Sequence, residues 1–278
     1  RGDAPAVSER DWRRAGGWRA RRAVPATPCR PAMSEPHVTN ATRCAQALAA
    51  PGASVTLLAR RETALQSALN TLHCTESQSH AYIQADVLHL DDVLDQIQKT
   101  GFDILINNSA GPAGGALQNA TDQQLMLVFQ QHVLSAQRLL KAVLPHMQKQ
   151  QWGRIVNIIS TSVKEPIAML GVSNTIRGAM ASWSKTLATE LGGDGITCNN
   201  VLPGYTKTQR LEQILLERSN NTGKSIEHVS QGMLATVPAA RFAEPLEIAH
   251  AVAFLCHINS VYINGINLPV DGGRTKSL

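Results

Sequence analysis

The chain has 278 residues and a formal net charge of +5. Residues 1–32 carry eight Arg against Asp3, Glu9 and Asp11, so the whole excess of positive charge lies in this segment and the rest of the chain is neutral. A basic face for nucleic acid is therefore not supported. No apolar run approaches the roughly 20 residues that cross a bilayer, and no signal-peptide core precedes the patterned region.

The patterns divide the chain into a tail and one domain. Residues 1–32 are rich in Arg, Ala, Pro and Gly without sustained periodicity, which predicts a disordered or non-native tail. An organelle transit peptide is the alternative, since such peptides are rich in Arg. Met33 looks like a natural beginning, and the strand and helix patterns that follow leave no second core, so we expect a single domain over 33–278.

The five cysteines are far apart and form no C-x-x-C or Cys/His ligand spacing. We therefore expect free thiols in a reducing compartment and no metal site. The sequence favours a cytoplasmic protein, with organelle import by the tail as the alternative.

From Ala53 the chain alternates between strand-like and helix-like segments. Strand patterns lie at 53–59, 81–86, 102–107, 155–159, 196–202 and 264–270, and helical patterns lie at 62–72, 91–100, 122–150, 210–234 and 245–255. The strands are apolar rather than alternating, which is typical of a parallel sheet covered on both faces. We predict an α/β fold with a doubly wound parallel sheet.

In such sheets ligands bind at the carboxyl ends of the strands. Those ends carry Asp86, Asn107, Ser160 and the pair Pro203-Gly204, which places the candidate ligand-binding residues along one rim. After Ser160, a helical pattern sets Ser173 and Arg177 on one face. A strand thus delivers polar groups to a helix.

This outline resembles the short-chain dehydrogenase/reductase family, in which a serine after the fifth strand precedes by thirteen positions the tyrosine of Y-x-x-x-K. Thirteen positions after Ser160 stands Ser173, and four positions further stands Arg177. The spacing of the family motif is therefore kept, but serine replaces its tyrosine and arginine replaces its lysine. Other family markers follow in order, namely NNSAG at 107–111, WGRIVNI at 152–158, NNVLPG at 199–204 and VDGG at 270–273. Within the family, the chain is most similar to the divergent branch that resembles 3-oxoacyl-carrier-protein reductases. That branch has an S-N-x-x-R pattern in this helix, which Ser173 to Arg177 match, and an R-x-x-S-L ending, which begins here at Arg274.

The resemblance implies a Rossmann-like oxidoreductase with a divergent active site. It would interconvert a carbonyl and a hydroxyl on a small-molecule or acyl substrate with NADP(H), as a homodimer or homotetramer. The alternative is a non-catalytic member that keeps the sheet and acts by oligomerisation or partner binding.

The chain departs most from the family in the segment that binds the cofactor's phosphates. The family has V-T-G-x-x-x-G-x-G between the first strand and the first helix, to cradle the pyrophosphate. Here Thr39 matches the start, Asn40 replaces the first glycine, and the interval is five residues short after Arg43. We expect a truncated first strand and glycine turn, with weak or absent NADP(H) binding. In the alternative, residues before Met33 supply the strand, and Thr39, Asn40 or Thr42 caps the helix.

Other cofactor contacts are implied by position. Arg60 stands where members that favour a 2′-phosphate carry a basic residue, which predicts NADP(H), although a solvated arginine is the alternative. Asp86 and Asn107 resemble the adenine-side contacts, with Ala110 in place of the usual glycine. Thr208 matches the position that contacts the nicotinamide carboxamide, or else is an ordinary loop threonine.

Carbonyl reduction also needs a proton donor. The hydroxyl of Ser173 is far less acidic than a phenol of pKa about 10, and Arg177 stays protonated, so it binds ribose hydroxyls at most. The alternative for this pair is a small helix residue and a surface arginine. We predict Ser160 as a hydrogen-bond donor to the substrate oxygen, and Tyr205 or His132 as the replacement acid. The alternatives are an aromatic lid at Tyr205 and a histidine at 132 that packs against the sheet.

Overall fold

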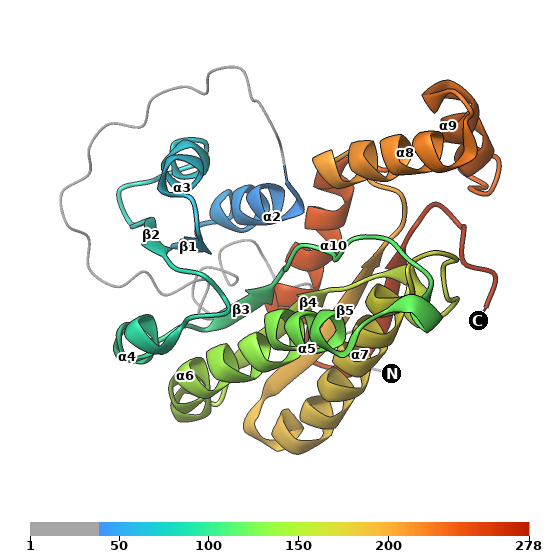
Figure 1. The fold of residues 1–278 in the computed structure, drawn as a ribbon. Coiled ribbons are helices and arrows are strands. Elements are labelled where there is room, and N and C mark those ends of the chain that lie inside the picture. Colours follow the sequence, from blue (N-terminus) through green and yellow to red (C-terminus); the bar gives the residue numbers. More distant parts are fainter. Residues whose placement is uncertain (1–38, 278) are drawn as a thin grey trace, which may run out of the picture.

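The computed structural model describes residues 39–277 and shows an α/β protein with parallel sheets (Figure 1). The predicted tail and the start at Met33 lie outside the described residues. The strands are β1 (Thr56–Ala59), β2 (Ala81–Gln84), β3 (Ile104–Asn107), β4 (Gly153–Ile158), β5 (Ile196–Pro203) and β6 (Asn267–Val270). The main helices are α2 (Asn40–Ala49), α3 (Glu62–Leu69), α4 (Asp91–Thr100), α5 (Asp122–Phe129), α6 (Ser135–Gln150), α7 (Gly171–Leu191), α8 (Gln209–Thr222), α9 (Ile226–Leu234) and α10 (Pro245–Cys256).

The strands form two sheets rather than the single sheet expected from the pattern. β1 pairs with β2, and a second sheet has the order β3-β4-β5-β6, with every pair parallel. Between residues 39 and 277 no strand joins β1 to β3, so each of these strands has one edge without a β partner. The six predicted strands are confirmed, and the expectation of one continuous sheet is not met by these residues.

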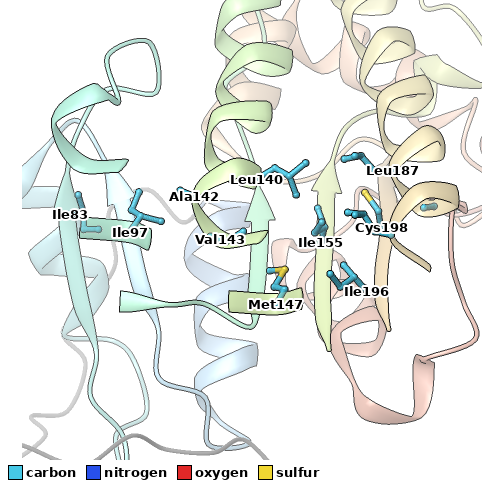
Figure 2. Packing of buried hydrophobic residues seen from close by; sticks show 12 residues of the cluster. Ile83, Ile97, Leu140, Ala142, Val143, Met147, Ile155, Leu187, Ile196 and Cys198 are labelled. Atoms are coloured by element: carbon cyan, nitrogen blue, oxygen red, sulfur yellow. The ribbon is translucent and has the colours of Figure 1, made fainter. Parts of the chain in front are cut away.

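Helices cover both faces of the four-stranded sheet, as the apolar strands predict. On one face Leu140, Val143 and Met147 of α6 pack with Ile155 and Ile196 (Figure 2). On the other face α2 and α10 pack against β4 and β5. All six residues of β4 are buried, because they lie between these two helical layers.

A ladder of asparagine side chains crosses the four-stranded sheet. Asn107 of β3 donates to Asn157 of β4 at 2.8 Å, Asn157 donates to Asn200 of β5 at 2.9 Å, and Asn200 donates to Asn267 of β6 at 2.8 Å. These four residues are also register partners along the strands. Because each buried amide has its acceptor on the next strand, a shift of any one strand would leave polar groups unpaired.

We expect Asn157→Ala to lower the free energy of unfolding by about 3 kcal/mol, because it leaves the amides of Asn107 and Asn200 without their central partner. Urea unfolding measures this loss. The control is Asn220→Ala on the exposed side of α8, which should change stability by no more than about 0.5 kcal/mol. A similar small effect at both positions would contradict a structural role for the ladder.

Candidate active site

The predicted rim lies at one edge of the four-stranded sheet. β3 ends at Asn107, Ser160 follows the end of β4, and β5 ends at Pro203. These strands are parallel neighbours, so their carboxyl ends meet at the same edge. Asp86 follows β2 and therefore belongs to the rim of the two-stranded sheet.

Ser160 begins a short 3-10 turn at Thr161–Val163. Its backbone is extended, and its Oγ accepts a hydrogen bond from the backbone N–H of Ser162 at 3.1 Å. A hydroxyl has one proton to donate and two lone pairs, so this capping bond leaves the proton available for a ligand. The half-buried Ser160 is thus oriented by its own turn.

Arg177 is a buried cation beneath the rim. It lies on α7, one turn after the half-buried Ser173, and only 7% of it is exposed. Its Nη1 donates to the carbonyl of Ile158 at 3.0 Å and its Nη2 to that of Ser109 at 3.3 Å. Burial, and then the nearby Arg210, lower the pKa of Arg177 to about 10, which leaves it protonated at pH 7. The alternative interpretation of Arg177 as a surface arginine is wrong.

His132 occupies a π-helical turn, Gln130–Leu134, that separates α5 from α6 within the predicted 122–150 helix. Such turns hold one extra residue and are frequent at functional sites. The Nε2 atom of His132 lies 3.1 Å from the carbonyl of Ala110, so Nε2 carries the proton and Nδ1 is left as an acceptor. Burial first, and then Arg177, lower the pKa of His132 to about 3. The imidazole is therefore neutral at pH 7.

Three side chains from different helices bind carbonyls of one loop. Arg177 bonds Ser109, His132 bonds Ala110, and Arg210 on α8 donates to the carbonyl of Pro112 at 2.7 Å. Arg210 is not among the predicted site residues, because the 210–234 segment has no motif. An arginine in the first turn of a helix, where the macrodipole disfavours a cation, is the signal that could have found it.

Tyr205 sits in an aromatic and cationic contact at the end of β5. Its ring meets Phe242 edge-on with centroids 6.1 Å apart, and the guanidinium of Arg274 lies 4.8 Å from the Tyr205 ring. Arg274 also donates to Oγ1 of Thr161 at 3.3 Å, which links the C-terminal segment to the turn after Ser160. The ring of Tyr205 is therefore held beside the rim, compatible with both predicted roles.

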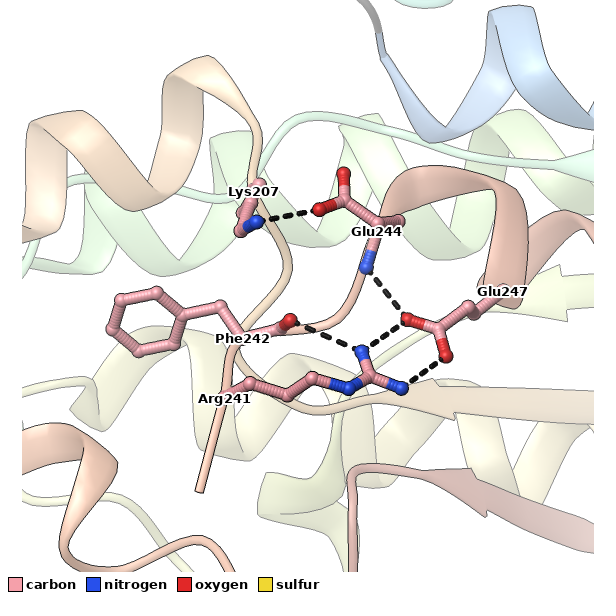
Figure 3. A network of polar contacts seen from close by, with 5 residues as sticks. All are labelled: Lys207, Arg241, Phe242, Glu244 and Glu247. Atoms are coloured by element: carbon pink, nitrogen blue, oxygen red, sulfur yellow. Dashed lines mark hydrogen bonds and ion pairs between the residues drawn. The ribbon is translucent and has the colours of Figure 1, made fainter. Parts of the chain in front are cut away.

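The segment after Tyr205 is fixed to the start of α10. Lys207 pairs with Glu244 at 2.5 Å, and Arg241 makes two bonds to Glu247 (Figure 3). Gly204 is needed nearby, because a Cβ there would lie 2.7 Å from the Cα of Asp271. Thr208, half-buried at the start of α8, donates its hydroxyl to the carbonyl of Thr206 at 3.3 Å.

At the other rim, Arg60 and Asp86 lie 3.9 Å apart. The Arg60 side chain is 76% exposed and Asp86 30%, so their attraction is largely screened by solvent. Oδ1 of Asp86 also accepts from the backbone of Leu88 at 3.0 Å. The structure thus places these two predicted cofactor residues together, with the Arg60 guanidinium within reach of solvent.

Helix α2 starts directly after Thr39. The Oγ1 of Thr39 accepts from the backbone of Thr42 at 3.1 Å and so caps the helix. Arg43 bonds Gln46 along the same helix at 2.7 Å. The sequence has no glycine between Met33 and Asn40, and Oδ1 of Asn40 is buried without a hydrogen-bond partner among residues 39–277. This lone acceptor is the opposite of what a phosphate requires.

Comparison with known proteins decides the family. A family model described as enoyl-(acyl carrier protein) reductase matches residues 41–275. The chain belongs to the short-chain dehydrogenase/reductase family. The 3-oxoacyl-[acyl-carrier-protein] reductase of Escherichia coli is 31% identical over 85% of this chain and 95% of its own length, and that of Haemophilus influenzae is 34% identical over 66% of this chain and 72% of its own. The structure of L-sorbose reductase from Gluconobacter frateurii, complexed with NADPH and L-sorbose, is 28% identical, with a TM-score of 0.79 over 86% of this chain and 93% of that one.

Several of the residues predicted to contact the cofactor line one cavity of the structure. A cavity of about 1430 Å³ is lined by Arg60 and Thr39, and also by Asn107, His132 and Arg177. Ser160, Ser173 and Tyr205 do not line it. The cavity therefore joins the predicted adenosine side to the buried cation.

Two further searches of residues 39–277 bear on the type of site. No three His, Cys, Asp or Glu side chains in this range come together as metal ligands. No helix in the same range is long and apolar enough to cross a membrane.

The lowered pKa of His132 makes stability depend on pH. Unfolding returns its pKa from about 3 to about 6.5, so its contribution is complete above pH 6.5 and is lost as the pH falls toward 3. We expect the wild type to lose about 2 kcal/mol from this source between pH 7 and pH 5, and His132→Gln to lack that loss. Urea midpoints across this range measure it. His250→Gln, at an exposed position, is the control, and equal pH slopes in all three proteins would contradict the assignment.

Proposed function

We propose that this protein is an NADP(H)-dependent oxidoreductase that interconverts a carbonyl and a hydroxyl on a small or acyl substrate. The observation that carries the proposal is the buried Arg177, which stays charged beneath the strand ends and within the same cavity as Arg60. Burying a cation costs stability, and charged groups with a shifted pKa that line a cavity are candidates for functional residues. Relatives named as 3-oxoacyl-[acyl-carrier-protein] reductases and as an NADPH-complexed sorbose reductase support the same reaction class.

Each residue of the site has a part in this proposal. Ser160, oriented by its capping bond, donates a hydrogen bond to the substrate oxygen and keeps its proton. Arg177 stabilises negative charge nearby and does not exchange protons, because its pKa of about 10 keeps it charged. Tyr205, or a proton path through His132, supplies the proton in place of a tyrosine at 173. The cofactor, when bound, supplies the hydride.

The alternative is a non-catalytic family member that works by oligomerisation or partner binding. One observation favours it: α2 begins directly at Asn40, with Thr39 satisfying the amide of Thr42. Pyrophosphate would then lack the donors that hold it in a glycine turn. Exposed apolar side chains on and after α5, including Met126 at 62% and Leu127 at 50%, are a surface on which a homodimer or homotetramer could be built.

The two functions differ in nucleotide binding. In a titration with NADPH followed by fluorescence and thermal shift, we expect saturation in the micromolar range for an enzyme. Arg60→Ala should weaken NADPH binding about tenfold and leave NADH binding unchanged, because a charge-assisted bond to the 2′-phosphate is lost. Lys99→Ala, at an exposed cation that does not line the cavity, is the control. No response to NADPH even at millimolar concentration would favour the non-catalytic alternative.

The acid can be identified by turnover. With a ketone substrate and NADPH, Tyr205→Phe and His132→Ala should each reduce kcat by about 100-fold if each takes part in proton transfer. Tyr82→Phe removes a phenol that bonds Glu62 far from the rim and should leave kcat unchanged. Wild-type rates in both site variants would end the surrogate-acid hypothesis, and loss in only one would assign the role to that residue.

A further inference from the structure

A single carboxylate fixes the C-terminal segment, by which we mean residues 271–277. Oε1 of Glu165 accepts a hydrogen bond from the backbone N–H of Lys276 at 2.6 Å and another from that of Ser277 at 2.8 Å. Backbone amides bond a carboxylate more strongly than they bond a neutral acceptor. Glu165 lies two residues after the 3-10 turn Thr161–Val163, so it ties the end of the segment to the turn that begins at Ser160.

A second carboxylate folds the same segment at its start. Oδ1 of Asp271 accepts from the backbone N–H of Gly273 at 3.0 Å, and Oδ2 of Asp271 accepts from that of Thr275 at 2.8 Å. Gly272 and Gly273 have φ angles of 65° and 83°, which glycine adopts without strain. The backbone of the C-terminal segment is therefore held on both sides of Arg274.

Between these two anchors, Arg274 contacts two parts of the candidate site. Its guanidinium lies 4.8 Å from the centroid of the Tyr205 ring, and its Nη1 donates to Oγ1 of Thr161 at 3.3 Å. A guanidinium over an aromatic face is attracted to the ring. Since Thr161 directly follows Ser160, one side chain joins the ring of Tyr205 to the turn that orients the Ser160 hydroxyl.

The surroundings of Arg274 keep its guanidinium in this position. Its Nε is buried and has no hydrogen-bond partner among residues 39–277. A buried donor without a partner costs stability, and another rotamer that reached water would remove that cost. The guanidinium stays in place because the carboxylates of Asp271 and Glu165 hold the backbone on either side of it.

We propose that Glu165 is a positioning residue that acts through Arg274. By holding the end of the C-terminal segment, Glu165 keeps the guanidinium against the Tyr205 ring and so aligns the hydroxyls of Tyr205 and Ser160 with the substrate oxygen. This inference rests on the proposed function. Misplacement of a reacting group by about 1 Å can cost on the order of 100-fold in rate, so loss of this restraint should affect turnover more than binding.

Tyrosine ring signals in NMR spectra test the link without any reaction. The chain has three tyrosines, and Tyr205→Phe assigns the signal of Tyr205. Glu165→Ala should shift this signal and speed hydrogen exchange of the Lys276 and Ser277 amides at least about tenfold. Glu165→Gln retains an oxygen acceptor and should keep both near their wild-type values. Glu190→Ala, at an exposed position of α7, is the control.

Turnover tests the effect on the proposed reaction. With a ketone substrate and NADPH, Glu165→Ala and Arg274→Met should each lower kcat about tenfold and change KM less than about twofold, because alignment is lost while binding contacts remain. Arg274→Lys should retain part of the rate, since it keeps the cation but not the planar guanidinium. Lys149→Met, at an exposed cation at the end of α6, should have no effect.

The results separate this inference from the proposed function. An unchanged Tyr205 ring signal in Glu165→Ala would overturn the inference, because Glu165 would then not act through Arg274. A raised KM at unchanged kcat in Arg274→Met would overturn it as well, since Arg274 would then bind substrate rather than position the site. A wild-type protein without any turnover would contradict the proposed function, and the ring signals would still decide whether Glu165 holds Arg274 in place.

Discussion

The amide ladder across β3, β4, β5 and β6 is the constraint on which the site depends. Each rung joins register partners, so the ladder sets how far each strand extends relative to its neighbours. The end of β3, the turn at Ser160 and the end of β5 consequently lie along one edge of the sheet, although β3 ends at the rung itself and β5 continues to Pro203. The positions of Ser160 and Tyr205 relative to one another therefore depend on hydrogen bonds between the strands that carry them.

Beneath this rim, the charge of Arg177 influences both the hydrogen bonding of nearby carbonyls and the pKa of His132. Arg177 satisfies carbonyls at the ends of two strands, and its charge adds to burial in keeping His132 neutral. A lysine at position 177 could lose its proton, whereas the guanidinium of Arg177 keeps it. Arginine in place of the family's lysine therefore provides a permanent charge but cannot transfer a proton. The neutral His132 in turn presents an unprotonated Nδ1. Tyr205, the other candidate acid, is held by Phe242 and Arg274 and does not line the cavity that His132 lines.

Sequence patterns predicted the features that depend on neighbouring residues, namely the strands and the spacing of residues along a helix. Apolar runs gave the six strands, and the frame from Ser160 to Arg177 placed the two residues on one face of α7. Patterns did not reveal the division into two sheets, because strand pairing depends on residues far apart in sequence. They also missed Arg210 and the contact of Arg274 with Tyr205, since both arise where distant loops meet. The burial of Arg177 could not be predicted from the sequence either, because its hydrogen-bond partners are backbone carbonyls, which every residue has.

The π-helical turn at Gln130–Leu134 has a consequence for how this protein could change. Such a turn absorbs one inserted residue without rotating the helices on either side. Deleting one residue there would leave Val128 and Leu140 facing the core as before, but would take His132 away from the carbonyl of Ala110. Deletion of one residue in this turn would therefore change the position of His132 and leave the packing of the flanking helices unchanged. Divergence of function in this chain can thus proceed by insertion or deletion at one turn, with no repacking of the core.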